Sequence, residues 1–209
     1  MDKNFFLIEH PIIKRDVTIL RDKDTDSEIF RAALQRVSNI LAVELSKEFK
    51  LTEIEVETPL EKARGAKLAN DVILVPVLRA GLGMVNGFLQ IIPEAKVGHI
   101  GLQRNEETLK PVEYYYKVPK NLESAEVVLL DPMLATGGSA SEALKYLKKR
   151  GAKKLAFACL VAAPAGVEKI NSEHPDVKIF TAALDRELNS KGYILPGLGD
   201  AGDRTFGTL

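Results

Sequence analysis

Residues 127–139 constrain the fold of this chain more than any other segment. Four apolar residues, 127–130, precede the acid Asp131, and a Thr-Gly-Gly-Ser turn follows at residues 136–139. A short apolar run is typical of a parallel strand buried on both faces, so Asp131 is expected at the carboxyl end of a strand, where open parallel sheets bind ligands. Glycines let the backbone approach an anion, and the hydroxyls add donors. The segment therefore predicts a phosphate-binding turn beside a carboxylate, which suits a sugar phosphate.

A helix is predicted directly after this turn. Ser139 and Glu142 have the spacing of a capping box, apolar residues recur on one helical face after them, and Gly151 is placed to end the helix. The positive end of such a helix would point at the turn. Strand-turn-helix connections with glycines are common, so a purely structural turn is the alternative. The carboxylate of Asp131 favours the ligand-binding interpretation.

Helical and strand patterns alternate along the rest of the chain. A wide apolar helical stripe covers residues 27–50, and another helical stretch ends at Ile92. Short apolar runs predict strands at residues 72–78, 97–102, 127–130, 155–163 and 177–183. The alternation predicts an α/β fold, a doubly wound, mainly parallel sheet with helices on both faces. A chain of 209 residues suits one domain, so residues 1–209 are taken as a single unit.

The composition narrows the classes of function. Lys plus Arg and Asp plus Glu number 29 each, so no net charge attracts nucleic acid or a membrane surface. A basic cluster at residues 145–154 lies at the end of the predicted helix, where cations complement the helix dipole. The single Cys159 lies in an apolar run and is expected to be a buried thiol. Without a signal pattern or a run of about 20 apolar residues, a cytoplasmic protein is expected.

Two arginines follow other predicted strands. Arg79 precedes Gly81-Leu82-Gly83, where backbone amides and a guanidinium together suit a diphosphate, although a surface arginine before a helix is the alternative. Arg104 begins a polar segment after residues 97–102 and is a weaker candidate alone. Two anion sites and a carboxylate suited to ribose hydroxyls describe phosphoribosyl diphosphate (PRPP).

Two other segments invite interpretation. Residues 197–202 spell G-x-G-x-x-G, but a dinucleotide fingerprint must open a helix inside a βαβ unit, and here only a few residues follow. This context rejects a nicotinamide-dependent oxidoreductase. Tyr114, Tyr115 and Tyr116 suggest a β-arm used for packing or subunit contact, with base stacking as the alternative.

Several motifs, in matching order over essentially the whole chain, resemble the uracil branch of the type I phosphoribosyltransferase family. They are His10-Pro11 and residues 76–83, 104–108, 131–139 and 192–204. The resemblance implies the family's fold, with a C-terminal hood that binds the base. It also implies transfer of a phosphoribosyl group from PRPP to uracil, giving UMP and diphosphate in pyrimidine salvage.

The resemblance assigns roles by matched position. Asp131, Arg79, Arg104 and Asp200 match the catalytic residues. The PRPP-binding set comprises Arg79, Arg104, Asp131, Pro132, Met133, Leu134, Ala135, Thr136, Gly137, Gly138, Ser139 and Asp200. Uracil would be bound by Ile194, Gly199, Asp200 and Ala201, largely through main chain. Mg²⁺ is expected to arrive with PRPP rather than in a protein cage, with Asp200 as a contact through water.

Further implications and departures complete the comparison with the family. A GTP effector and a homodimer or larger homo-oligomer are implied, with no nucleic-acid or membrane partner. Pro132 stands where type I enzymes usually carry a second acid, as is typical of the uracil branch. Gln103, Arg15-Asp16 and Ser190-Lys191 depart from the family's usual residues. A pyrimidine-sensing RNA-binding regulator on the same fold is the remaining rival, and it should show a basic face.

Overall fold

A computed structural model describes residues 3–104 and 111–208, and of Arg104 and Pro111 it describes the backbone alone. The main sheet has nine strands, with the order β1-β11-β10-β8-β4-β6-β7, while β5 pairs with β4 and β9 with β10. All pairings are parallel except that of β6 with β7. The strands are β1 (Phe5–Leu7), β4 (Val72–Leu78), β5 (Lys96–Val97), β6 (His99–Arg104), β7 (Pro111–Lys117), β8 (Glu126–Leu130), β9 (Met133–Leu134), β10 (Lys154–Ala162) and β11 (Lys178–Leu184).

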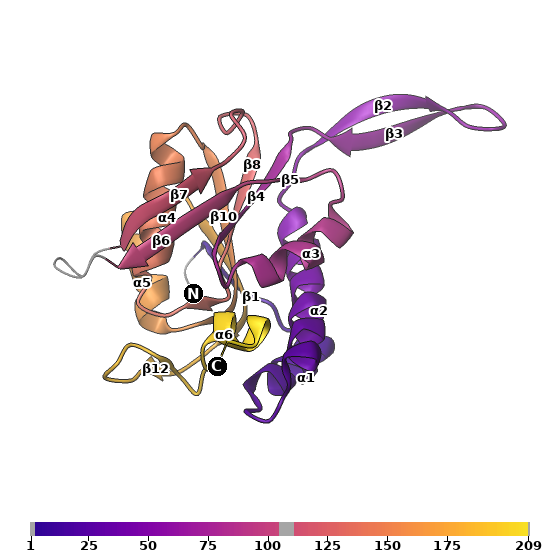
Figure 1. The fold of residues 1–209 in the computed structure, drawn as a ribbon. Helices are drawn as coiled ribbons and strands as arrows, with labels where there is room; N and C mark the ends of the chain where they lie inside the picture. Colours follow the sequence, from indigo (N-terminus) through magenta and orange to yellow (C-terminus); the bar gives the residue numbers. More distant parts are fainter. Residues whose placement is uncertain (1–2, 105–110, 209) are drawn as a thin grey trace.

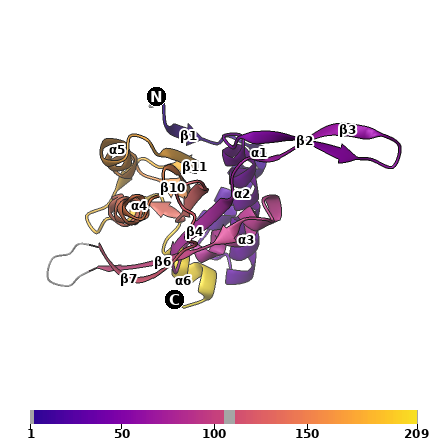
Figure 2. The ribbon, with the colours of Figure 1, turned by 90° about the horizontal axis from the view of Figure 1, so that it is seen from above.

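Helices cover both faces of this sheet (Figures 1 and 2). One face carries α1 (Pro11–Arg21), α2 (Ser27–Ser46) and α3 (Leu82–Ile91), and the other carries α4 (Gly138–Lys149) and α5 (Pro164–Glu173). Side chains alternate along β8: Val128 and Leu130 join the core under α1–α3, whereas Val127 and Leu129 join the core under α4 and α5. The predicted doubly wound α/β class is confirmed.

Most predicted elements are present with small shifts of their ends. The strand predicted at residues 72–78 matches β4, and the one at 97–102 is divided at Gly98 into β5 and β6. The predicted capping box is wrong. Gly137, with a left-handed φ of 75°, is the N-cap of α4, and no side chain caps the helix there. Gly151 does end the helix, with φ 98°.

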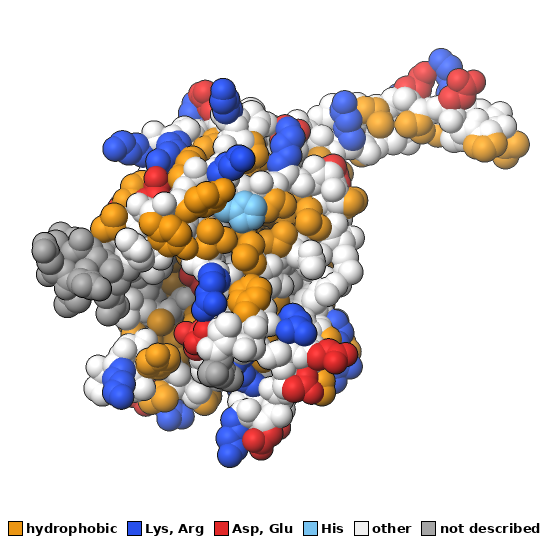
Figure 3. Space-filling model, in the orientation of Figure 1, with side chains coloured by type: hydrophobic (Ala, Val, Ile, Leu, Met, Phe, Trp, Pro, Cys, Tyr) orange, Lys and Arg blue, Asp and Glu red, His pale blue; other side chains and the backbone are white. Residues whose placement is uncertain are grey.

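The hairpin that projects from the body was not predicted. β2 (Leu51–Glu57) and β3 (Lys62–Leu68) pair antiparallel and extend away from the sheet, carrying hydrophobic side chains (Figures 1 and 3). Leu60 in its turn is 96% exposed. The β-arm predicted at Tyr114–Tyr116 is misplaced, because these residues lie in β7 at the edge of the main sheet.

The C-terminal segment forms a hood at the carboxyl edge of the sheet. It consists of β12 (Glu187–Leu188), which pairs antiparallel with β13 (Ile194–Leu195), and of α6 (Ala201–Phe206). Helix α6 contacts α2, so the hood is fixed to the helical layer on one face. In the described residues, no helix has both the length and the apolar character needed to cross a membrane.

Candidate active site

The site is built where three neighbouring strands end. Asp131 follows β8, Arg79 follows β4, and Arg104 is the last residue of β6. Because β8 and β6 both flank β4 as parallel strands, their carboxyl ends meet at one edge of the sheet. Asp131 and Arg79 thus follow strands, as the sequence predicted, and the sheet places the two strand ends side by side.

The turn after Asp131 leaves little space behind it. Gly137 adopts φ 75°, and a Cβ built there would lie 3.1 Å from the Gly166 carbonyl oxygen. Gly166 in α5 is tighter still, since its own Cβ would lie 2.5 Å from the Ala135 carbonyl oxygen. The Thr136 hydroxyl accepts a long hydrogen bond, 3.4 Å, from the Gly138 N–H. α5 thus supports the turn from below, while α4 directs its amino end at the same place.

The loop after β4 packs against the end of β8. A Cβ at Gly81 would lie 2.3 Å from the Leu130 carbonyl oxygen, so only glycine fits there. The peptide bond between Leu78 and Arg79 is cis. The Arg79 side chain, 56% exposed, donates to Asp203 in α6 at 2.9 Å. The guanidinium of Arg79 therefore links the loop after β4 to the hood.

A cavity of about 250 Å³, here called the central cavity, lies between these elements. It brings together Arg79, Asp131, Ser139 and Asp200, four of the residues predicted for the site. The remaining lining residues are Val77, Leu78, Ala80, Leu102 and Gly202. Asp200 is exposed and its carboxylate accepts from the Asp203 N–H at 2.9 Å, so it also caps α6. Two carboxylates and a guanidinium therefore face one space.

Asp131 has a perturbed acidity. Burial raises the pKa of its carboxyl to about 7. The carboxylate also accepts a hydrogen bond from the Met133 N–H at 3.4 Å, which lowers the pKa by less than burial raises it. The residue remains partly accessible from the central cavity. Donors from a ligand would favour its ionised form. Such a carboxylate is prepared to accept hydrogen bonds from hydroxyl groups that enter the cavity.

A second cavity, the hood cavity, occupies about 480 Å³. Met133 and Ala135 form one side, and residues 191–199 of the hood form the other. Ile194 and Gly199, both predicted to bind the base, line it, whereas Ala201 is fully buried at the start of α6. The sequence Gly197-Leu198-Gly199 lies between β13 and the six-residue α6. It opens no βαβ unit, so the dinucleotide interpretation stays rejected.

For some residues predicted to bind PRPP, the structure gives a position but does not test the predicted role. Pro132 and Leu134 are buried beneath the turn, and they shape it rather than face the central cavity. The side chain of Arg104 and the Asn105–Thr108 part of its motif lie outside the described residues. The roles of Arg104 and of these neighbours stay predictions.

Sequence reasoning missed the residues that hold the hood. Asp185 follows β11 at the same sheet edge as Asp131, and this position is the signal that could have found it. It accepts from Arg21 at 2.5 and 2.8 Å. Arg204 lies within a motif noted in the sequence, and its side chain is 8% exposed. Asp203, in the same motif, accepts a hydrogen bond from Arg79.

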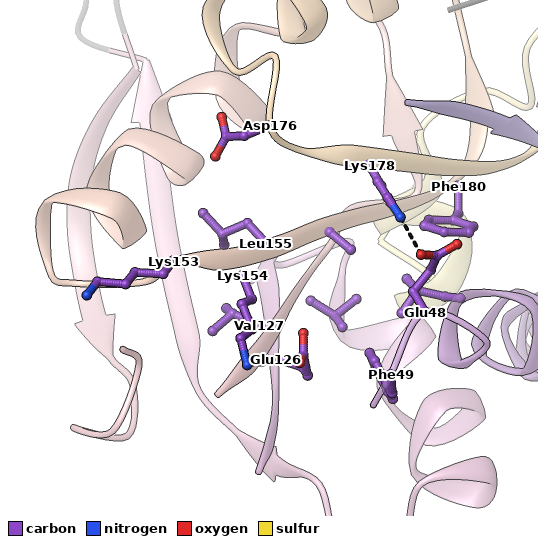
Figure 4. A pocket seen from close by; sticks show the side chains of 13 residues that line it. Glu48, Phe49, Glu126, Val127, Lys153, Lys154, Leu155, Asp176, Lys178 and Phe180 are labelled. Atoms are coloured by element: carbon purple, nitrogen blue, oxygen red, sulfur yellow. Dashed lines mark hydrogen bonds and ion pairs between the residues drawn. The ribbon is translucent and has the colours of Figure 1, made fainter. Parts of the chain in front are cut away.

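Charged groups elsewhere are paired with one another. A cavity of about 190 Å³ lies at the amino-terminal edge of the sheet, where Lys178 points at Glu48 (Figure 4). In the basic cluster at residues 145–154, five of the six cations form ion pairs: Lys145–Glu173, Lys148–Asp176, Arg150–Glu113, Lys153–Glu123 and Lys154–Glu126. These pairs favour a structural role for the cluster over an RNA-binding patch.

Comparison with known proteins decides the family. The family model described as uracil phosphoribosyltransferase matches residues 7–208. The chain belongs to the uracil phosphoribosyltransferase family. A uracil phosphoribosyltransferase of Geobacillus sp. (strain WCH70) is 53% identical over 204 residues, covering 97% of this chain and 98% of the relative. One from Salinibacter ruber is 52% identical over 206 residues, covering 99% and 98%.

Solved structures share the fold of this uracil phosphoribosyltransferase family member. The AQ2163 protein from Aquifex aeolicus superimposes with a TM-score of 0.91 at 42% identity, and the match covers 97% of each chain. A hypoxanthine phosphoribosyltransferase from Trypanosoma cruzi, at 11% identity and a TM-score of 0.54, covers 76% of each chain and shares the fold. The resemblance read from the motifs is confirmed.

Proposed function

We propose that this protein transfers the phosphoribosyl group of PRPP to uracil, releasing diphosphate and forming UMP, as a step of pyrimidine salvage. The observation that carries the proposal is the single central cavity shared by Arg79, Asp131, Ser139 and Asp200, with Ala135 and Met133 of the same turn facing the hood cavity. PRPP has a phosphate, two hydroxyls and a diphosphate, and this arrangement offers a separate partner for each.

The turn at residues 136–139 is assigned to the 5-phosphate. Gly137 in its left-handed conformation allows close backbone approach, and the amino end of the twelve-residue α4 favours negative charge. Asp131, which lies between β8 and this turn, would accept hydrogen bonds from the ribose hydroxyls. Those donors, absent before substrate binds, favour the ionised carboxylate although burial raises its pKa.

Arg79 is assigned to the diphosphate. Negative charge collects on this leaving group as its bond to the anomeric carbon breaks, and a fixed guanidinium stabilises that charge. Mg²⁺ bound to the diphosphate would neutralise further charge, since this ion usually keeps waters and substrate phosphates as ligands. Asp200, exposed in the same cavity, is the residue that would contact it through water. Arg104 is proposed to assist from the end of β6.

The hood cavity is assigned to uracil. Attack by N1 of the base on the anomeric carbon, from the face opposite diphosphate, requires the base and the leaving group to lie on different sides of the ribose. One turn contributes to both cavities: Met133 and Ala135 line the hood cavity, whereas Asp131 and Ser139 line the central one together with Arg79. Main-chain groups of fixed polarity would reject a base that presents an amino group.

Cellular context and assembly extend the proposal. We propose a cytoplasmic enzyme because the one cysteine is a buried free thiol, as is usual in reducing compartments. The exposed apolar hairpin, with Leu60 at its turn, supports a homo-oligomer. A GTP effector rests on the family resemblance alone. Sedimentation and a GTP titration of the initial rate would test these two statements.

A competition assay tests the reaction. Labelled uracil, PRPP and Mg²⁺ should give labelled UMP. Unlabelled hypoxanthine or orotate in excess should leave the rate unchanged, and cytosine should compete only weakly. Loss of labelled UMP in the presence of hypoxanthine or orotate would contradict the assignment of the base. The RNA-binding regulator predicts instead a gel shift with RNA at physiological salt.

A further inference from the structure

The backbone that lines the hood cavity is held from behind by charged side chains. Gly197 is fixed at both of its polar atoms: its N–H donates to Asp185 at 2.9 Å, and its carbonyl accepts from Arg21 at 2.8 Å. Arg21 and Asp185 also bind each other through two hydrogen bonds, at 2.5 and 2.8 Å. The side chain of Asp185 is 4% exposed and that of Arg21 is 25% exposed. We call Arg21 and Asp185 the hood clamp.

The next peptide group is held by a different arginine. Arg204 donates to the Leu198 carbonyl at 2.9 Å and also to the carbonyls of Leu20 and Asp22, and its guanidinium lies 4.5 Å from the ring centre of Phe30. It therefore joins the hood to the end of α1. Two successive carbonyls of the hood, at positions 197 and 198, point at arginines.

These carbonyls determine where the following amides point. The peptide bond between Leu198 and Gly199 is trans, so its N–H points away from its carbonyl. With the Leu198 carbonyl directed at Arg204, the Gly199 N–H is directed to the opposite side of the peptide plane. Gly199 lines the hood cavity, and no hydrogen bond to its N–H occurs within the part of the chain that the structure describes. Gly199 therefore carries a free main-chain donor at the wall of the hood cavity.

We infer that the hood clamp and Arg204 are positioning residues that set the specificity of the base pocket. The inference rests on the proposed function, because it concerns how the main chain recognises a carbonyl of uracil. A main-chain donor cannot be changed by substitution of its own side chain, so its direction depends on what holds the neighbouring carbonyl. The charged groups achieve this without touching the base.

The chain contains a matched control for the hood clamp. Asp16, also in α1, is fully buried and accepts from Arg36 at 2.8 and 3.0 Å. Like Asp185, Asp16 is a buried carboxylate that accepts two hydrogen bonds from a partly exposed arginine, although Arg15 donates two more to it at 3.0 and 3.2 Å. It contacts α2 rather than the hood. Asp16→Asn and Asp185→Asn therefore remove equivalent charges, but only the second loosens residues 197–199.

The test compares Asp185→Asn and Arg21→Lys with Asp16→Asn and Arg36→Lys. We expect both hood-clamp variants to raise the KM for uracil about tenfold, as for the loss of one hydrogen bond, while the KM for PRPP changes less than about twofold. Cytosine, used as a competitive inhibitor, should keep its inhibition constant. The ratio of that constant to the uracil KM should then fall about tenfold. Arg21→Lys keeps the charge and serves if Asp185→Asn does not fold.

Hydrogen exchange of the substrate-free protein provides a readout that does not need activity. The amide of Gly197, which donates to Asp185, should exchange faster in both hood-clamp variants and at the wild-type rate in Asp16→Asn. Unchanged exchange and an unchanged uracil KM would overturn the inference, as would equal increases in the KM for uracil and PRPP. A wild-type protein that protects this amide yet makes no UMP would instead overturn the proposed function.

Discussion

Arg79 donates a hydrogen bond to Asp203 across 2.9 Å, and this contact joins the loop after β4 to the hood helix 124 residues further along the chain. Phe206 of the same helix lies 6.0 Å, measured to its ring centre, from the guanidinium. The arginine assigned to diphosphate is therefore already oriented before substrate binds. Its partner must yield or share it when diphosphate enters.

Variants of Arg79 and Asp203 separate the expected contact of Arg79 with diphosphate from its ion pair with Asp203. We predict that Arg79→Ala lowers kcat/KM for PRPP about 100-fold, because a guanidinium aimed at a developing anion contributes on this scale. Stability should change little, since exposed ion pairs contribute about 0–1 kcal/mol. Asp203→Asn removes the same ion pair but keeps the guanidinium, and it should change kcat/KM less than about fivefold. Equal losses in the two variants would show that Arg79 acts only through Asp203.

The acidity of Asp131 predicts a stability that depends on pH. Its pKa of about 7 in the folded protein lies above the ordinary aspartate pKa of 3.8. The contribution of this group to stability is therefore full below the lower pKa and is lost as the pH rises through the upper one. Asp131→Asn removes the buried charge. Its Tm in the absence of substrate should exceed that of the wild type at about pH 8.5 and match it near pH 4, while UMP synthesis is lost. A pH-independent difference in Tm would contradict the assigned burial of the charge.

Asp200 allows the charge at the cavity to be changed without loss of a helix cap. Asparagine caps helices about as well as aspartate, so Asp200→Asn should keep the hydrogen bond to the Asp203 N–H and the fold. We expect the Mg²⁺ concentration at half-maximal rate to rise several-fold. Circular dichroism provides the folding control, and a Mg²⁺ titration identical to that of the wild type would remove the metal role.

Gly166 tests whether α5 supports the phosphate turn. Glycine is unfavourable inside a helix by about 0.5–1 kcal/mol relative to alanine, so Gly166→Ala would stabilise α5 if nothing stood against it. The new methyl group would, however, lie 2.5 Å from the Ala135 carbonyl oxygen. We predict a raised KM for PRPP in this variant and none in Gly65→Ala, where the nearest atom to the added Cβ is 3.7 Å away. An unchanged KM for PRPP in Gly166→Ala would show that the turn does not need this support.

Strand ends explain why part of the site could be predicted. β4 and β8 are apolar runs that need no distant partner to be recognised, and Asp131 and Arg79 are the first polar residues after them. The sheet then brings both residues to one edge. The family resemblance contributed the hood, whose short strands and six-residue helix have too little periodicity to be found from pattern alone.

Long-range hydrogen bonds explain what could not be predicted. Arg21 meets Asp185 and Gly197 across 164 and 176 residues of sequence, and no local pattern encodes such pairs. The capping box failed for a different reason: Gly137 supplies a left-handed backbone at the N-cap, so Ser139 is left to face the central cavity. The projecting hairpin was missed because its two strands mix apolar and charged residues, and neither contains a continuous apolar run.

Phosphorus NMR of a mixture of uracil, PRPP and Mg²⁺ tests the central claim most directly, because it follows both products at once. The account predicts that the wild-type protein converts PRPP into equal amounts of UMP and diphosphate, and that Asp131→Asn, folded and at the same concentration, gives neither at a comparable rate. Equal rates in the two proteins, or ribose 5-phosphate in place of UMP, would contradict it.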